Sequence, residues 1–254
     1  MIGGVAGDGW LVAAVGIIVF AGVVKSVTGL GIPVVGTPLL VLIYGHLAIV
    51  VAVMSIPTTV CSGYFVWRTR GHVQGVLVTL GLLLPCGVIG VVAGTHLLVT
   101  VPTRILAGVL AGVIAVFVIS QVARRAQPAV GERASPALAP VVGVLSGALQ
   151  GTSGASGPLV TMYLLRRPLS RNAFFFAANA AFLVFDLTQM ATLANLGQLT
   201  PGRAAGGALA LVPLFGGVWA GAWLARRVDD HLFRYGVLAI LAVTAVSLGA
   251  RALA

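Results

Sequence analysis

Two short polar stretches interrupt otherwise apolar parts of the chain, and their residues are the first candidates for chemistry. Residues 28–33 read Thr-Gly-Leu-Gly-Ile-Pro, and residues 151–158 read Gly-Thr-Ser-Gly-Ala-Ser-Gly-Pro. Glycine allows non-helical backbone, and proline suits the first turn of a new helix. Each stretch therefore predicts that one helix ends and another begins there. Helix N-termini present free N–H groups and a positive dipole end, which suit an anion.

Polar side chains at these two breaks could bind such an anion. Their hydroxyl and amide groups can donate hydrogen bonds to oxyanion oxygens, and Lys25, the only lysine, could supply a positive field. Two simpler roles stay open, because small residues also let helices pack closely and a lysine can extend to a membrane interface. The candidate binding residues are Lys25, Thr28, Gly29, Gly31, Gln150, Thr152, Ser153, Gly154 and Ser156.

Asp186 is the only acidic residue within an apolar run. It follows Asn172 and Asn179 at steps of seven, which keep the three side chains near one face of a helix. A polar stripe on a membrane helix faces the protein interior or a water path. Asp186, with Asn179 on the same stripe, could carry a proton that couples transport to the proton gradient. Alternatively, Asp186 could be a structural partner of Lys25 or of a helix end.

The remaining polar residues give weaker signals. The stripe of Ser55, Thr59 and Ser62 is ambiguous, because such hydroxyls often bond to their own helix. The two cysteines lie in separate apolar segments without the spacing of a metal site. An intramembrane enzyme would need a metal cluster or a nucleophile with its base, and the sole glutamate, Glu132, lies in a polar linker. The sequence therefore predicts no enzymatic activity, no metal and no cofactor.

The composition indicates which elements must position these residues. Only 15 basic and 5 acidic residues occur among 254, while 59% of positions are apolar. Soluble domains are about 25% charged, and here uncharged runs of about 20 residues recur, each able to span the bilayer core as a helix. The net charge of +10 lies in arginine clusters between the runs, a pattern of membrane topology and not of nucleic-acid binding. We expect an all-α polytopic protein embedded in a lipid bilayer.

The apolar runs fall into two sets of four. They lie at residues 10–44, 46–67, 73–98 and 105–123, and at residues 137–165, 172–196, 204–224 and 232–250. The pattern predicts an N-terminal repeat over 1–123, a cytoplasmic linker over 124–136 and a C-terminal repeat over 137–254. Without a gap, the repeats align Gly22 with Gly147, Lys25 with Gln150, Thr28 with Ser153, Gly29 with Gly154 and Pro33 with Pro158. The pair Gly90 and Gly94 finds its counterpart in Gly217 and Gly221.

The arginines favour one topology. If each broken run is a hairpin that returns to its own side and the N-terminus is outside, 11 of the 14 arginines are cytoplasmic and only Arg104, Arg203 and Arg251 are external. This asymmetry is the one expected of membrane proteins. It predicts six full crossings and two re-entrant hairpins, arranged as two inverted repeats, each a re-entrant or broken helical hairpin followed by three transmembrane helices. The tips of the hairpins would meet near the bilayer midplane.

Segments 22–39 and 147–164 resemble the TauE/SafE sulfite exporter family, since each has a glycine-rich break followed by proline in the first run of a four-segment unit. The resemblance covers nearly the whole chain. It implies export of sulfite, sulfoacetate or other sulfonates and small organic anions, and thus a place in a bacterial inner membrane. In place of a fuller run of glycines, this chain has Ile32 in one break and Ala155 and Ser156 in the other. The positions that carry the resemblance are Gly29, Gly31, Pro33, Pro38, Gly154, Gly157 and Pro158.

The leading hypothesis is a secondary transporter that exports a small anion by alternating access. If the protein is a transporter, the alternative is a carrier of a cation or a neutral solute. Asp186 permits this alternative, but Lys25 and the net positive charge disfavour it. A non-transporting membrane scaffold is the alternative outside transport. The many glycines would also permit a homodimer through close helix contacts.

Overall fold

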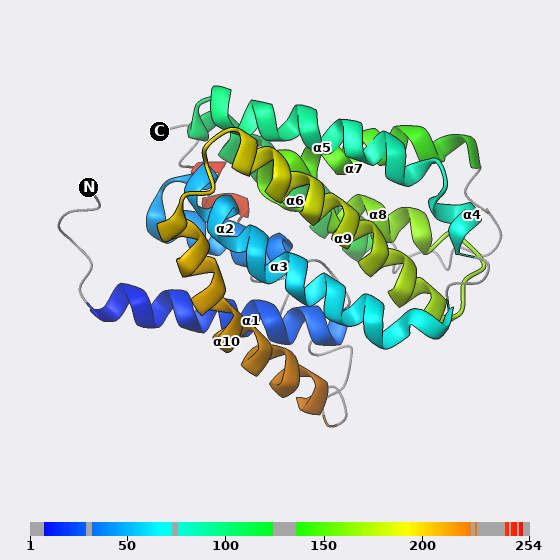
Figure 1. Ribbon diagram of the computed structural model, residues 1–254, viewed down its shortest axis with the longest axis horizontal. Helices are drawn as coiled ribbons and strands as arrows, with labels where there is room; N and C mark the ends of the chain where they lie inside the picture. The colour runs from blue at the N-terminus through cyan, green and yellow to red at the C-terminus, as the bar shows by residue number, and fades with distance from the viewer. Residues whose placement is uncertain are drawn as a thin grey trace.

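The computed structural model describes residues 8–28, 32–72, 76–123, 136–224, 227, 242–243, 245–247 and 249–250 (Figure 1). These residues form helices and connecting turns, and no strand occurs among them. The helices are α1 (Asp8–Thr28), α2 (Ile32–Tyr44), α3 (Leu47–Thr69), α4 (Leu77–Leu80), α5 (Leu83–Thr100), α6 (Thr103–Ala123), α7 (Ala139–Ser153), α8 (Gly157–Leu164), α9 (Arg171–Asn195) and α10 (Pro201–Leu224), with short 3-10 turns at Arg70–His72 and Pro136–Leu138.

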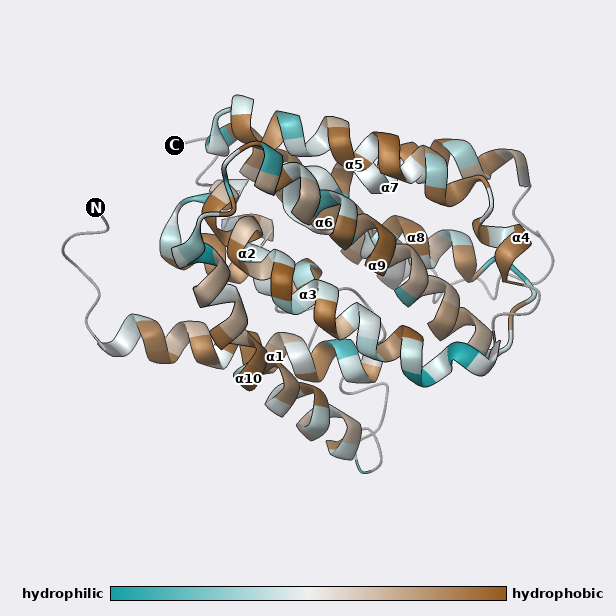
Figure 2. Cartoon of the chain, viewed as in Figure 1, coloured by the Kyte–Doolittle hydropathy of each residue, from teal (hydrophilic) through white to brown (hydrophobic). Residues whose placement is uncertain are grey.

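The helices have the length and apolar surface of membrane spans. Within the described residues, five segments are long and apolar enough to cross a bilayer: Gly9–Val27, Leu47–Thr69, Leu77–Thr100, Asn172–Asn195 and Pro201–Leu224. Figure 2 shows predominantly hydrophobic residues along α1, α5 and α10. Large apolar side chains such as Val78 and Trp219 are exposed at the surface, where lipid would cover them. The predicted all-α polytopic membrane protein is confirmed.

The second predicted helix break is present, between Ser153 and Gly157. At the first, residues 29–31 lie outside the described residues; α1 precedes them, and α2 follows them and packs back against α1. Gly154 adopts φ 75°, a left-handed conformation that suits glycine, and its N–H donates to the Gln150 carbonyl at 2.7 Å. With 13 and 8 residues, α2 and α8 rise only about 20 Å and 12 Å, too little to cross the bilayer core alone. Helix α1, with 21 residues, is long enough for a crossing by itself.

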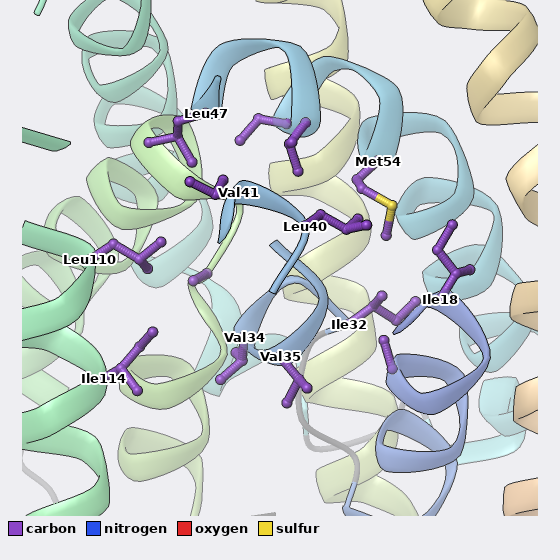
Figure 3. Close-up of a cluster of buried hydrophobic side chains, with 14 of the residues drawn as sticks. Ile18, Ile32, Val34, Val35, Leu40, Val41, Leu47, Met54, Leu110 and Ile114 are labelled. Carbon is purple, nitrogen blue, oxygen red and sulfur yellow. The ribbon is translucent and has the colours of Figure 1, made fainter. Parts of the chain in front are cut away.

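Helix α2 folds back into the protein interior beside α1. A Cβ atom placed on Gly36 would lie 3.3 Å from the Cβ of Ala21 in α1. Figure 3 shows α2 enclosed on several sides, with Ile18 of α1, Met54 of α3 and Ile114 of α6 around it. This burial explains why a half-length helix is tolerated at membrane depth, because protein and not lipid surrounds its broken end.

The helices pair across the two sequence repeats. Helix α1 packs along α10, α5 packs along α7, and α3 lies beside α9 (Figure 1). Thus α1 and α7, which begin the two sets, each contact the third run of the other set, which forms α10 or α5. The second runs, α3 and α9, contact each other. Equivalent helices make equivalent contacts, as a duplicated fold would require. The boundaries of the repeats and their opposite orientation in the membrane stay predictions.

Glycines allow these helix pairs to approach closely. A Cβ atom on Gly22 would lie 2.5 Å from the Leu214 carbonyl of α10, and one on its counterpart Gly147 would meet the Gly87 carbonyl of α5. Small residues have this role in membrane helix packing. These glycines serve contacts within the chain, so they are not available to the predicted homodimer, which stays a prediction.

Replacing Gly147 by alanine is expected to destabilise the fold by about 1–3 kcal/mol, because α5 and α7 would have to move apart. Gly112 in α6 is a matched control, since a Cβ atom there would have nothing within 4 Å. We expect the melting temperature of the purified protein to fall for Gly147→Ala and not for Gly112→Ala. Equal melting temperatures would show that the α5–α7 contact is loose.

Three arginines that distinguish the possible membrane topologies, Arg68, Arg167 and Arg203, lie at two different ends of the helix bundle. Ser62 of α3 pairs with Asp186 of α9, and Lys25 contacts Phe65 of α3 and Phe182 of α9, so the two helices run antiparallel. Arg68 near the end of α3 and Arg167 before the start of α9 therefore lie at the same end. A Cβ atom on Gly207 would lie 2.6 Å from the Val53 carbonyl, which places the start of α10, and Arg203, toward the other end of α3.

Single cysteines introduced at Arg68 and Arg167 are therefore expected to be labelled from the cytoplasm, and one at Arg203 from outside. Gln127 lies outside the described residues, and from the predicted topology we expect a cysteine there to be labelled from the cytoplasm as well. The background for this labelling experiment lacks Cys61 and Cys86. Labelling at Gln127 and Arg167 from opposite sides would mean that the second broken run crosses the membrane, and the inverted repeat would be wrong.

Candidate functional site

A network of buried polar side chains joins three helices at the second break. The amide of Gln150 donates from Nε2 to Asp186 Oδ1 at 2.7 Å and to Gln189 Oε1 at 3.1 Å. Its Oε1 accepts from the Ser156 hydroxyl at 2.7 Å, and the Ser62 hydroxyl donates to Asp186 Oδ2 at 3.0 Å. Helices α3, α7 and α9 are thereby tied to the chain that enters α8.

Gln189 completes this network at the end of α7. Its Nε2 donates to the carbonyls of Gln150 and Gly151 at 2.6 and 3.0 Å. The last carbonyls of a helix lack partners within the helix and need such donors when buried. Sequence reasoning missed Gln189, although it follows Asp186 by three residues and so shares its helix face.

A small enclosed cavity lies between the two breaks. Its volume is about 10 Å³ for the centre of a water molecule, enough for about one water. Pro33 belongs to the first break, and Gly154 and Ser156 belong to the second, so the structure brings both breaks to one place. The complete lining is Lys25, Ile32, Pro33, Thr58, Ser62, Gln150, Gly154, Ser156, Phe182 and Asp186.

Lys25 is a buried lysine with an unusual set of neighbours. Its side chain is 2% exposed, and its Nζ lies 4.7 Å from the ring centre of Phe182 and 5.6 Å from that of Phe65. Within the described residues, no group accepts a hydrogen bond from Nζ or forms an ion pair with it. Asp186 and Cys61 are the titratable groups that act on it electrostatically.

Two aromatic faces do not replace a hydrogen-bond acceptor for an ammonium group. Cation–π contacts are worth about 0.5–2 kcal/mol, whereas burying a charge without an acceptor costs more. The acceptor requirement of an ammonium at Lys25 is therefore unmet by the described residues, and a water in the cavity, or an anion in a wider form of it, would meet it. The alternative that Lys25 extends to a membrane interface is excluded, because the side chain is buried beside α3 and α9.

Other sequence candidates lie near the cavity without lining it. The hydroxyl of Thr152 donates to the Ala148 carbonyl at 2.9 Å, and that of Ser153 donates to the Leu149 carbonyl at 2.8 Å. Both hydroxyls are thus used by their own helix. Gly29 and Gly31 lie outside the described residues. Thr28 ends α1, and its side chain is likewise outside the description.

The polar stripe of α9 runs from the surface to the interior. Asn172 is exposed, Asn179 is fully buried, and Asp186 reaches the cavity. The Asn179 amide donates to the Phe175 carbonyl at 2.8 Å, while its Oδ1 has no partner in the structure. Asn179 does not itself line the cavity, so any part it plays in coupling is indirect.

Sequence reasoning underestimated helix α3. Thr58, Ser62 and Phe65 recur at steps of four and three, the spacing of one helix face, and all three lie at the cavity or at Lys25. Ser62 was a weak candidate because serine often bonds to its own helix. Ser55 and Thr59 do bond in that way, whereas Ser62 reaches Asp186.

Broken helices that meet at buried polar side chains, here Lys25 and Asp186, are a feature of membrane transporters. Residues 14–248 match the family model described as Sulfite exporter TauE/SafE, and the chain belongs to this family. The resemblance carried by the breaks is thereby confirmed over nearly the whole chain. The protein is a multi-pass membrane transporter by family. No curated protein and no solved structure matches the chain.

Proposed function

We propose that the protein exports a small anion, such as sulfite, sulfoacetate or a related sulfonate or organic acid, by alternating access. Its substrate site lies between the two helix breaks, and its location is the inner membrane of a bacterium. The observation that carries this proposal is the buried ammonium of Lys25, which has aromatic neighbours but no acceptor among the described residues.

The charges around the cavity favour an anion over a cation. Asp186 already accepts hydrogen bonds on both carboxylate oxygens, from Ser62 and Gln150. Lys25 has donors without acceptors, so a bound oxyanion would supply the group that the site lacks. A cation would have to occupy the same small cavity beside Lys25, and like charges repel strongly where the dielectric constant is low.

The size of the cavity supports alternating access. A space for about one water is too small for an anion with several oxygens, so the cavity in this conformation is narrower than the proposed substrate. Substrate entry requires the two breaks to separate on one side of the membrane. In transporters with broken helices, such separation takes the form of one group of helices rocking against another.

Asp186 is the proposed coupling residue. It is the carboxylate of the cavity and lies on the helix stripe that leads through Asn179 to the exposed Asn172. A proton gained or lost at Asp186 would change the charge opposite Lys25 and hence the affinity for an anion. The hydrogen bonds from Ser62 and Gln150 also give Asp186 a structural role, and the variant Asp186→Asn separates the two roles.

Ligand-induced stabilisation of the purified protein tests the proposed substrate class. A ligand that binds the native state raises the melting temperature in proportion to the logarithm of its concentration above Kd. The panel is sulfite, sulfoacetate, taurine, sulfate, acetate and the chlorides of sodium and potassium. We expect sulfite or a sulfonate to stabilise the protein and to be transported into liposomes. Stabilisation by cations alone would favour a cation carrier, and binding without flux would favour a scaffold.

A further inference from the structure

Thr37 in α2 has a buried hydroxyl that no described residue satisfies. Its side chain is 1% exposed, and its Oγ1 has no hydrogen-bond partner among the residues that the structure describes. Among the described residues, it is the only buried hydroxyl in this condition. A buried polar atom without a partner costs free energy, and in a native structure it often marks the place of a missing water or ion.

Thr37 differs in this respect from comparable threonines. Thr58 donates to the Met54 carbonyl at 2.9 Å, Thr95 to the Val91 carbonyl at 2.7 Å, and Thr161 to the Gly157 carbonyl at 2.6 Å. Each of these hydroxyls uses the carbonyl one turn earlier in its own helix, the usual arrangement for a buried threonine. Thr37 makes no such bond, so its hydroxyl remains free to interact with another group.

The position of Thr37 links it to the cavity. It follows Pro33 by four residues, so both lie on one face of α2, and Pro33 lines the cavity. A Cβ atom on Gly154 would lie 3.0 Å from the Cβ of Pro33 and 3.9 Å from Oγ1 of Thr37. The hydroxyl therefore lies beside Gly154, where α2 meets the second break.

We propose that the Thr37 hydroxyl is a specificity-determining ligand of the transported anion, donating a hydrogen bond to one of its oxygens while Lys25 supplies the positive charge. This inference rests on the proposed function. When α2 and Gly154 separate to admit the substrate, the space created lies between the Thr37 hydroxyl and the existing cavity. In this conformation Gly154 packs against Pro33 of α2, and no described residue makes a hydrogen bond with the Thr37 hydroxyl.

The second repeat offers no equivalent of this hydroxyl. The gap-free alignment that matches Pro33 with Pro158 places Met162 opposite Thr37. Thr161, beside it, bonds within α8 to the carbonyls of Gly157 and Pro158. Thr37 is thus an asymmetric feature of the site, contributed by α2 alone.

Sulfite binding by Thr37→Val, Thr37→Ser and Thr161→Val tests this proposal, with affinities taken from titrations of the melting temperature of the full-length protein. Valine keeps the shape of threonine and removes the hydroxyl, so Thr37→Val is expected to bind sulfite about tenfold more weakly or worse, as for a lost hydrogen bond to a charged group. Serine keeps the donor and is expected to retain most of the affinity. Thr161→Val is the matched control and is expected to bind as the wild type does.

The melting temperature without ligand gives a second readout. Thr37→Val removes an unsatisfied polar atom and is expected to melt at or above the wild-type temperature, whereas Thr161→Val loses a hydrogen bond and is expected to melt lower. If valine at position 37 prevents folding, Thr37→Ala compared with Thr37→Ser makes the same test.

The outcomes separate this proposal from the proposed function. Wild-type sulfite affinity in Thr37→Val would overturn the role of Thr37 and leave anion transport standing. Stabilisation of the wild type by sodium alone, lost in Thr37→Val, would overturn both, because the hydroxyl oxygen would then bind a cation.

Discussion

Replacing Lys25 by methionine is expected to abolish anion binding. Methionine keeps an unbranched apolar side chain between Phe65 and Phe182 but removes the only buried positive charge found in the described part of the chain. The loss of one partner from a buried charge pair costs about 2–5 kcal/mol, so the affinity for sulfite should fall by about 30-fold or more. The measurement is the sulfite-dependent rise in melting temperature, followed by flux into liposomes.

Arg203→Met is the matched control for this loss of charge. Arg203 donates to the Gln198 carbonyl at 2.7 Å at the start of α10, away from the cavity. Arg203→Met changes the net charge by the same amount as Lys25→Met, and we expect the sulfite affinity of Arg203→Met to stay at the wild-type level. An affinity for sulfite in Lys25→Met equal to that of Arg203→Met would move the anion site elsewhere.

Lys25→Met leaves Asp186 without the opposite charge that acts on it, which could lower stability. The double variant Lys25→Met/Asp186→Asn removes both charges and avoids this problem. It is expected to fold and still to bind no sulfite, so a folding defect in the single variant would not obscure the result.

The sequence predicted those parts of the fold that depend on residue types that are uncommon within an apolar run. Glycine and proline in an apolar run indicate a helix break, and α1 ends at Thr28 and α7 at Ser153, as expected. A charged or amide side chain in such a run is costly unless the interior uses it, and Lys25, Gln150 and Asp186 all line the cavity. The repeated glycines also anticipated close helix contacts, which Gly22 and Gly147 make in equivalent places.

The other features of the site could not be predicted, because they depend on which helix faces meet, and one sequence does not contain that information. Phe65 and Phe182 are ordinary residues of apolar helices until α3 and α9 bring both rings to Lys25. Thr37 becomes distinctive only because its hydroxyl lacks the bond within the helix that Thr58 and Thr161 make. Thr152 and Ser153 had the right type and place for a ligand, yet their hydroxyls bond to carbonyls one turn earlier in α7, a local choice that residue type and spacing do not reveal.

Asp186→Asn is expected to remove the dependence of anion flux on an imposed pH gradient while anion binding persists. Asparagine cannot carry the proton that the proposed coupling requires. Its side chain has nearly the same shape, so Oδ1 can still accept from Gln150, whose donor lies 2.7 Å from Asp186 Oδ1 in the wild type. The Ser62 hydroxyl, 3.0 Å from Oδ2, can rotate to accept from the new amide group.

The measurement is sulfite flux into liposomes at equal and unequal internal and external pH, for the wild type and Asp186→Asn. The wild type should respond to the gradient, and the variant should transport at a rate that does not depend on it. Loss of the negative charge should also tighten anion binding at Lys25, because Asp186 no longer repels the substrate. Asn179→Ala is a useful comparison, since it alters the same stripe of α9 without removing a titratable group. It should keep the response to pH.

A pH response in Asp186→Asn equal to that of the wild type would reduce Asp186 to the structural role that its bonds to Ser62 and Gln150 already give it. The coupling proton would then have to bind elsewhere, and Cys61 and Lys25 are the other titratable groups that act on this carboxylate or on its partner. Cys61→Ala would separate these two, because it removes the thiol and leaves the anion-binding charge of Lys25 in place. Flux that ignores the pH gradient even in the wild type would instead mean that the anion moves down its own electrochemical gradient, and the carboxylate would serve only to hold α3, α7 and α9 together around the site.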